Sequence, residues 1–267
     1  MKEQIYTIPV MDAFKEESEC PLCILESNLE NYYIDYVLGP SLMEPSCRIE
    51  TNEKGFCRRH FELLFNKQEN RLGLGLIIDT HLFELNKTLK KMYNKLSKIK
   101  PYKNKRELQI TTELQNSKKN IFSRSPSYKQ SMYNFVDELI KELTEIENQC
   151  MVCDRINYTM DRYIEVILHL WCKEEEFRNL FCAKNGFCLK HLRLLLEGTK
   201  KYLDSNNIYN FVEILLKMEV ENMERIKNEV SWFTEKFDYR NVDAPWGNSK
   251  DSIQRSIQKI VGPCNFK

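Results

Sequence analysis

Six cysteines and two histidines recur in two groups with almost the same spacing. Each group has a C-x2-C pair followed by a C-x2-H pair, and the gap between the pairs holds 33 residues in the first group and 34 in the second. Three thiolates and one imidazole form a full tetrahedral ligand set, and structural zinc sites are commonly Cys₃His. We therefore predict two Zn²⁺ ions per chain. The expected ligands are Cys20, Cys23, Cys57 and His60 in the first group, and Cys150, Cys153, Cys188 and His191 in the second.

The spacing within each group suits ligands placed at the starts of helices. A C-x2-C pair lets two sulfurs converge on one ion from a single turn, and Pro21 favours the first position of a helix. Cys57 and His60 are three residues apart, so they share one face of a helix. Gly55 and Gly186 are expected to lie at the tight turns that lead into the helices carrying the C-x2-H pairs.

Residues around the ligands also match, which predicts an internal repeat. The tripeptide Tyr-Ile-Asp at 33–35 lies 130 positions before Tyr-Ile-Glu at 163–165, and similar matches follow both C-x2-H pairs. Each site could form within one repeat, or the C-x2-C of one repeat could close on the C-x2-H of the other. Because the two gaps are so similar, we expect the within-repeat arrangement.

Two other interpretations of the ligand groups remain open, a cluster of reduced buried thiols and an iron–sulfur cluster. Iron–sulfur clusters usually use four cysteines, which favours zinc. Four further cysteines do not match between the repeats, and we expect them to be packing or surface thiols. They are Cys47, Cys172, Cys182 and Cys264. Cys182 could exchange into the nearby site, while His81 and His169 are expected to be core or interface residues.

The elements that position these ligands should be almost entirely helical. Apolar residues at alternating spacings of four and three predict a helix from about Leu74 to Lys100, with a heptad seam. The seam is Ile78, Leu82, Leu85, Leu89, Met92, Leu96 and Ile99. Similar spacing predicts a second long helix over 208–237, with an apolar stripe that includes Val212, Leu216, Val220 and Ile226. Shorter helices are expected over 127–148 and near 253–261. The fold class is therefore all-α, made of pseudo-duplicated units with long amphipathic helices.

Composition excludes several classes of protein. The 267 residues hold 40 Lys+Arg against 39 Asp+Glu, so the net charge of +1 gives no general attraction to nucleic acid or membranes. The first residues have no apolar signal region, and no stretch is long and apolar enough to span a membrane. We therefore expect a cytoplasmic protein with reduced thiols and no membrane association.

A basic stretch separates the two repeats. Residues 87–129 hold thirteen Lys+Arg and only two acids, which leaves nucleic-acid binding open as an alternative. Aromatic residues are sparse there and no recognition helix is evident, so we expect no nucleic-acid binding. The predicted organisation is a first metal-binding unit at 1–100, a basic linker at 101–127, a second metal-binding unit at 128–237, and a C-terminal loop and short helix at 238–267.

The motif set resembles a bacterial family of unknown function whose members carry CPLC and GFCxxH motifs twice. The matching segments are Cys-Pro-Leu-Cys at 20–23, Gly-Phe-Cys-Arg-Arg-His at 55–60, Leu-Gly-Leu-Gly-Leu at 72–76 and Asp-Ala-Pro-Trp-Gly-Asn-Ser at 243–249. Members are sometimes labelled transporter substrate-binding proteins, a role for which this sequence has neither signal peptide nor lipid-anchor cysteine. The second C-x2-C, Cys150-Met-Val-Cys153, lacks the proline of the family pattern. The resemblance implies the paired motifs but no particular activity.

These observations favour structural metal sites over catalysis, because four protein ligands leave no open position on the ion. No catalytic triad, phosphate-binding glycine loop or small-molecule substrate site is recognisable. We therefore expect a non-enzymatic role in interaction or regulation, through a protein partner or self-association. The alternatives are a nucleic-acid-associated regulator and a metalloenzyme or metal or redox sensor with an exchangeable ligand.

Overall fold

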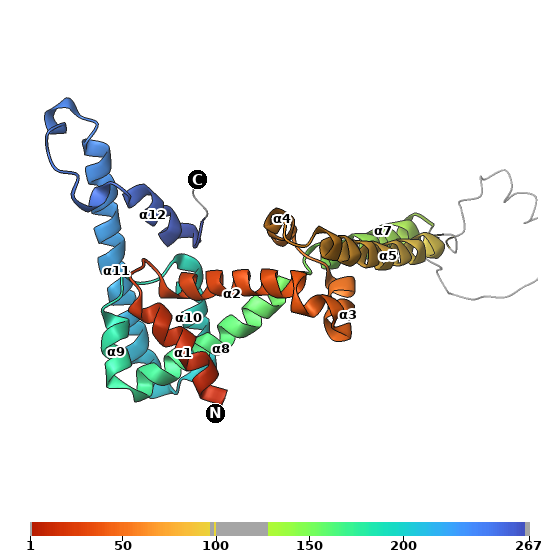
Figure 1. The fold of residues 1–267 in the computed structure, drawn as a ribbon, viewed down its shortest axis with the longest axis horizontal. Coiled ribbons are helices and arrows are strands. Elements are labelled where there is room, and N and C mark those ends of the chain that lie inside the picture. Colours follow the sequence, from red (N-terminus) through yellow and green to blue (C-terminus); the bar gives the residue numbers. More distant parts are fainter. Residues whose placement is uncertain (1, 97–98, 100–127, 265–267) are drawn as a thin grey trace, which may run out of the picture. The chain divides into compact units, whose positions relative to one another are not determined.

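The computed structural model describes residues 2–96, 99 and 128–264 of the protein. These residues form eleven α-helices and no β-strand, which confirms the all-α prediction (Figure 1). In chain order the helices are α1 (Lys2–Lys15), α2 (Pro21–Leu38), α3 (Pro45–Lys54), α4 (Arg58–Lys67), α5 (Arg71–Leu96), α7 (Tyr128–Glu147), α8 (Met151–Lys173), α9 (Glu175–Cys182), α10 (Leu189–Tyr202), α11 (Ser205–Glu235) and α12 (Ser252–Val261). The predicted basic linker at 101–127 lies outside the described residues.

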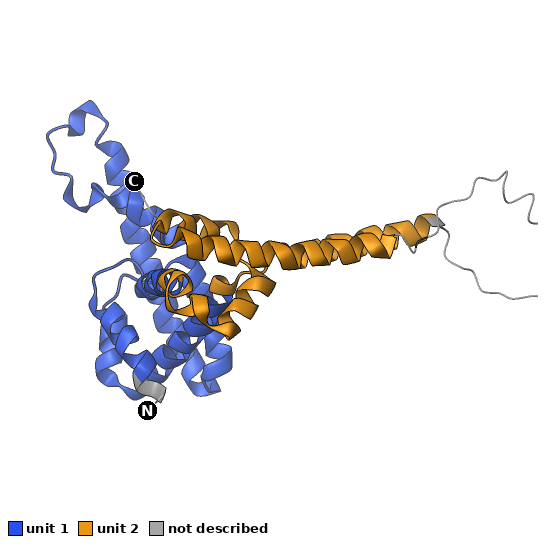
Figure 2. Ribbon diagram, turned by 45° about the vertical axis from the view of Figure 1, so that its right-hand side comes forward, with its two compact units in different colours: residues 1–33, 154–267 blue, residues 34–153 orange. Residues whose placement is uncertain are grey.

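The chain forms two compact units, each built from separated segments. Unit 1 comprises residues 1–33 and 154–267, and unit 2 comprises residues 34–153 (Figure 2). These units do not coincide with the predicted units at 1–100 and 128–237. The chain passes from one unit to the other inside α2 and again near the start of α8.

The order of helices is the same after both C-x2-C pairs. A long helix follows each pair (α2 and α8), then a short one (α3 and α9), one that begins at the C-x2-H pair (α4 and α10), and a final long one (α5 and α11). The predicted helix starts at Pro21 and after both GFC segments are confirmed. The helix predicted over 127–148 is α7.

Helix α5 ends at Leu96, and most of the predicted continuation to Lys100 lies outside the described residues. Its predicted heptad seam is split between two environments. Met92 is buried and Leu85 is half-buried, whereas Leu82 and Leu89 are 57% and 52% exposed. Only part of the seam therefore packs against other described residues.

In unit 1, aromatic side chains from four elements form the core. Phe181 of α9 lies 5.8, 5.4 and 5.5 Å, ring centre to ring centre, from Phe14 of α1, Phe187 and Phe211 of α11. Phe187 belongs to the second GFC segment, so its burial holds that segment against the core. Fully burying a phenylalanine side chain contributes roughly 1.5–3 kcal/mol.

In the first half of α11 the predicted stripe was wrong by one position, whereas Ile226 of the same stripe is buried as predicted. Leu216 and Val220 are exposed, while Leu215 and Phe211 are buried. The sequence offers apolar residues on adjacent helical faces, and the ring of Phe211 decides which face turns inward, since it packs on Trp171 as well as Phe181. No helix in the described ranges has the length and apolar character needed to cross a membrane.

Candidate metal centres

Two clusters of three cysteines and one histidine lie within the described residues, one in each unit. The α2/α10 cluster is Cys20, Cys23, Cys188 and His191, and the α4/α8 cluster is Cys57, His60, Cys150 and Cys153. In each cluster the four candidate ligand atoms all lie within 4.8 Å of one another. Together the clusters use all eight predicted ligand residues.

Distances in the α2/α10 cluster are close to the edges of a tetrahedron around zinc. Zn–S bonds of about 2.3 Å and Zn–N bonds of about 2.0–2.1 Å place two sulfurs about 3.8 Å apart, and a sulfur and nitrogen about 3.6 Å apart. The Sγ atoms of Cys23 and Cys188 are 3.6 Å apart. His191 Nδ1 lies 3.4, 3.4 and 3.1 Å from the sulfurs of Cys20, Cys23 and Cys188. The donor set therefore fits one tetrahedral metal ion.

The α4/α8 cluster has the same geometry. His60 Nδ1 lies 3.2 Å from Cys57 Sγ, 3.2 Å from Cys150 Sγ and 3.4 Å from Cys153 Sγ, and the sulfurs of Cys57 and Cys153 are 3.8 Å apart. In both clusters the histidine presents Nδ1 to the sulfurs, which leaves Nε2 for a second interaction.

The pairing of the ligands corrects the within-repeat prediction. Each cluster joins the C-x2-C of one repeat to the C-x2-H of the other. Helix lengths favour this pairing. The 18 residues of α2 carry the chain about 27 Å away from Cys23 along the helix axis, whereas the ten residues of α3 are only about 15 Å long. In the second repeat α8 is about 35 Å long, whereas α9 is only about 12 Å long. Each C-x2-H pair therefore belongs to the same unit as the C-x2-C pair of the other repeat.

Each cluster lies where two helices begin. Cys20 and Cys150 directly precede α2 and α8, while Cys57 and Cys188 are the N-caps of α4 and α10. Helix N-termini carry partial positive charge, which stabilises the thiolate forms that bind metal. In the α4/α8 cluster, the backbone N–H of Met151 also donates a hydrogen bond to the carbonyl of Gly55 at 3.1 Å, which ties the two pairs together.

Electrostatics within each cluster favour one thiolate next to the histidine, because the pKa values of Cys150 and Cys188 are lowered while hydrogen bonds to these thiolates raise the pKa values of Cys153 and Cys23. Hydrogen bonds from Cys153 and His60, acting against burial, lower the pKa of Cys150 to about 3. Burial lowers the pKa of His191, but hydrogen bonds to Cys188, Cys20 and Glu26 outweigh it and raise this pKa to about 11. The imidazole must lose its second proton to ligate a metal, so acid pH should weaken binding.

Glu26 faces the second ring nitrogen of His191, and no sequence motif predicts this contact. Its Oε2 lies 3.3 Å from His191 Nε2, and its Oε1 pairs with Lys190. Burial raises the pKa of Glu26, but the close approach of His191 and the ion pair with Lys190 outweigh it and hold the pKa below its usual value. A carboxylate on the second ring nitrogen orients a ligating histidine. Glu26 lies one helical turn after Cys23, a spacing that could have pointed to it.

Replacing Glu26 with Gln should weaken metal binding at the α2/α10 cluster by about 10- to 100-fold, as other losses of a carboxylate behind a metal-bound histidine do. Competition with a chromophoric zinc chelator would measure this. Glu62→Gln is the control, since Glu62 lies on α4 two residues after His60 but is largely exposed and pairs with Arg58. Equal affinities for the two variants would show that Glu26 does not support His191.

A buried ion pair supports the turn before Cys188. Gly186 has a φ of 81°, and a Cβ there would collide with the side chains of Glu219 and Lys259. The Phe187 N–H donates to Glu219, and the Lys259 ammonium donates to the carbonyl of Asn185. Helices α11 and α12 therefore hold the turn that presents Cys188. The predicted need for glycine at this turn is confirmed.

At the other turn, Gly55 has a φ of 59°, and a Cβ there would collide with the ring of His81. The Nδ1 of His81 lies 2.8 Å from the carbonyl of Asn52. His81 is thus a packing residue beside the α4/α8 cluster and is not one of its candidate ligands.

A charged network anchors the segment before Cys20. Glu19, which is 8% exposed, pairs with Arg225 of α11 and Arg255 of α12. Glu229 pairs with both arginines, and Asp251 pairs with Arg255. The network connects the start of α2 to α11 and α12, and so fixes the position of the first C-x2-C pair in unit 1.

The remaining cysteines lie outside both clusters. Cys47 is buried, Cys172 and Cys264 are half-buried, and Cys182 is exposed at the end of α9. None of them joins the four-ligand groups among the described residues, which agrees with their interpretation as packing or surface thiols.

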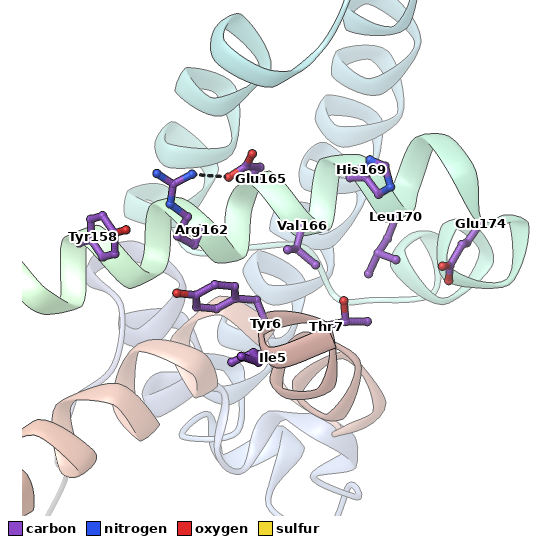
Figure 3. Close-up of a pocket in the computed structure, with 10 residues that line it drawn as sticks. All are labelled: Ile5, Tyr6, Thr7, Tyr158, Arg162, Glu165, Val166, His169, Leu170 and Glu174. Carbon is purple, nitrogen blue, oxygen red and sulfur yellow. Dashed lines mark hydrogen bonds and ion pairs between the residues drawn. The ribbon is translucent and has the colours of Figure 1, made fainter. Parts of the chain in front are cut away.

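His169 lines a groove of about 750 Å³ between α1 and α8 in unit 1 (Figure 3). Ile5, Val166 and Leu170 supply apolar lining, and Arg162 is paired with Glu165 at 2.7 Å. The groove contains none of the eight candidate ligands. His169 is therefore placed at a surface between two helices, apart from the metal clusters.

Comparisons with known proteins agree with the motif resemblance. No solved structure matches the chain. The chain is 26% identical over 102 residues to an uncharacterized 23.9 kDa protein in the xynA 3' region of Caldicellulosiruptor sp. (strain Rt8B.4). That match covers 38% of this chain and 47% of the relative, so the chain spans about half of the relative's length. The profile of a family of unknown function, DUF6062, matches residues 1–267, and the chain therefore belongs to this family.

Proposed function

We propose that this protein is a cytoplasmic, two-zinc helical protein whose ions are structural and whose role is interaction or regulation. The observation that carries the proposal is the pair of Cys₃His clusters with tetrahedral spacing. Four protein ligands close the coordination sphere of zinc, which is typical of structural sites. The burial of His60, Cys150, His191 and Cys188 favours the same role.

The proposed role of the metal is to join distant parts of the chain. One ion would tie residues near 20 to residues near 190, and the other would tie residues near 60 to residues near 150. Closing long loops costs conformational entropy that grows slowly with loop length, so a metal bond between distant segments is an effective restraint. The crossed pairing also supports an internal repeat in which the two copies have exchanged their C-x2-H pairs.

Protein purified without added metal should contain two zinc ions per chain. Elemental analysis combined with titration of free thiols measures this directly. Bound zinc protects six of the ten cysteines from a thiol reagent, and chelation exposes them. Finding no transition metal, with all ten thiols free, would contradict the proposal.

A sensor with exchangeable metal is the second candidate, and one observation favours it. A cavity of about 280 Å³ is lined by Cys20, Cys23 and Gln258, so a small chelator or thiol could approach the α2/α10 cluster. The nucleic-acid alternative receives less support. Lys95, within the basic stretch, is already paired with Glu138 and Glu142 at 2.8 Å each.

A further inference from the structure

Helices α5 and α7 carry stripes of exposed apolar side chains in unit 2. On α5 the exposed residues are Leu82, Leu89, Tyr93 and Leu96, which are 39–73% exposed. On α7 they are Tyr133, Val136, Ile140 and Leu143, which are 43–57% exposed. We call these eight residues the hairpin face. Contiguous exposed apolar surface of this kind marks an interaction site.

The spacing of these residues is that of a helix-packing seam. On α7 the positions 133, 136, 140 and 143 are separated by three, four and three residues. On α5 the positions 82, 86, 89, 93 and 96 are separated by four, three, four and three, with Asn86 as the one polar member. Such a heptad pattern predicts packing against another helix, and a single Asn in a seam commonly specifies register and the number of helices.

The two stripes lie on the same side of the helix pair. Tyr93 follows the buried Met92, and Val136 follows the buried Phe135. On each helix the exposed stripe is therefore rotated about 100° from the buried face, in the same sense on both helices. The two helices run in opposite directions, and the bonds from Lys95 to Glu138 and Glu142 join them (Figure 1). In an antiparallel pair, equal rotations turn both stripes to one side.

Charge identifies a second copy of this chain as the partner. Residues 82–96 hold four lysines and one glutamate, a net charge of +3. Residues 128–147 hold two lysines and five acids, a net charge of −3. Opposite charges already pair α5 with α7 within the chain, through Lys95. A second copy offers the same complementarity when α5 of each copy lies against α7 of the other.

We propose that two copies of the chain associate through the hairpin face, with α5 of each packed antiparallel on α7 of the other. The result is a four-helix arrangement related by a two-fold axis, the commonest symmetry of homodimers. The hairpin face includes none of the metal ligands, so this association is a property of the helices beyond the proposed metal role.

The test is the mass of the full-length chain in solution, measured by light scattering and sedimentation equilibrium over a wide concentration range. The chain has a mass of 32.0 kDa, and we expect a species of twice that mass. The double variant Leu89→Lys/Ile140→Lys should raise the dimer dissociation constant about a hundredfold, because it places unpaired charges in an apolar interface. Val220→Lys on α11 is the control, since Val220 is 67% exposed and outside the hairpin face.

Helical content and metal content of the variants show whether they fold. Asn86→Leu gives a result that misfolding cannot mimic, because removing the polar seam residue should tighten the dimer. A wild-type chain that is monomeric at every concentration would overturn the proposal. So would a dimer that Leu89→Lys/Ile140→Lys weakens no more than Val220→Lys does, or one that Asn86→Leu leaves unchanged.

Discussion

A chain carrying both Cys23→Ser and Cys188→Ser should retain one zinc ion at full affinity. These two cysteines belong to the α2/α10 cluster, so the double substitution removes two ligands from one ion and none from the other. The α4/α8 cluster keeps all four ligands. Elemental analysis should therefore give one zinc ion per chain, where the unmodified chain is expected to bind two.

The matched control is Cys23→Ser with Cys57→Ser. It also removes two thiols, but it takes one from each cluster, and both ions should then bind far more weakly. Cobalt substitution distinguishes the variants, because intact Cys₃His sites keep their thiolate-to-metal absorption. If instead the Cys23/Cys57 variant kept one intact site and the Cys23/Cys188 variant lost both, the ligands would pair within repeats.

Loss of the ion in the α4/α8 cluster should destabilise unit 2 much more than loss of the ion in the α2/α10 cluster destabilises unit 1. Among the described residues, 24 buried hydrophobic residues fall in unit 1 and 13 in unit 2. Unit 1 has the aromatic core around Phe181 to hold it together, whereas unit 2 depends more on the α4/α8 cluster. Binding of structural zinc is worth about 10–16 kcal/mol in small peptides, which is more than the whole stability of many domains.

His60→Ala and His191→Ala are the variants to compare, since each removes the imidazole of one cluster. Hydrogen exchange should show that His60→Ala abolishes protection across α3, α4 and the start of α5, while His191→Ala weakens protection only near α10. Both histidines are at most 3% exposed, so lost packing is similar in the two variants. If His191→Ala removed as much protection from unit 1 as His60→Ala removes from unit 2, the hydrophobic core of unit 1 would not compensate for the lost metal ion.

Much of the fold and of the candidate site was predictable from the sequence. The ligand residue types and their local spacing are set by chemistry within one helical turn, so all eight candidates and the helix starts at Pro21 and after both GFC segments could be found. Glycines at 55 and 186 were predictable because a positive φ at a tight turn suits glycine. The long helices were predictable from their apolar periodicity, although the buried face of the first half of α11 was not.

Only the tertiary structure decided which ligand pairs meet. Matched gaps of 33 and 34 residues suggest two self-contained repeats, but in the structure each C-x2-H pair lies beside the C-x2-C pair of the other repeat. The lengths of α2 and α8, each longer than the helix that follows it, favour this arrangement. The partner of His191 was equally hidden, because Glu26 is 165 residues away in the chain. Local residue types and spacing determine which side chains can bind a metal. Helix lengths and packing in three dimensions determine which of those side chains share one.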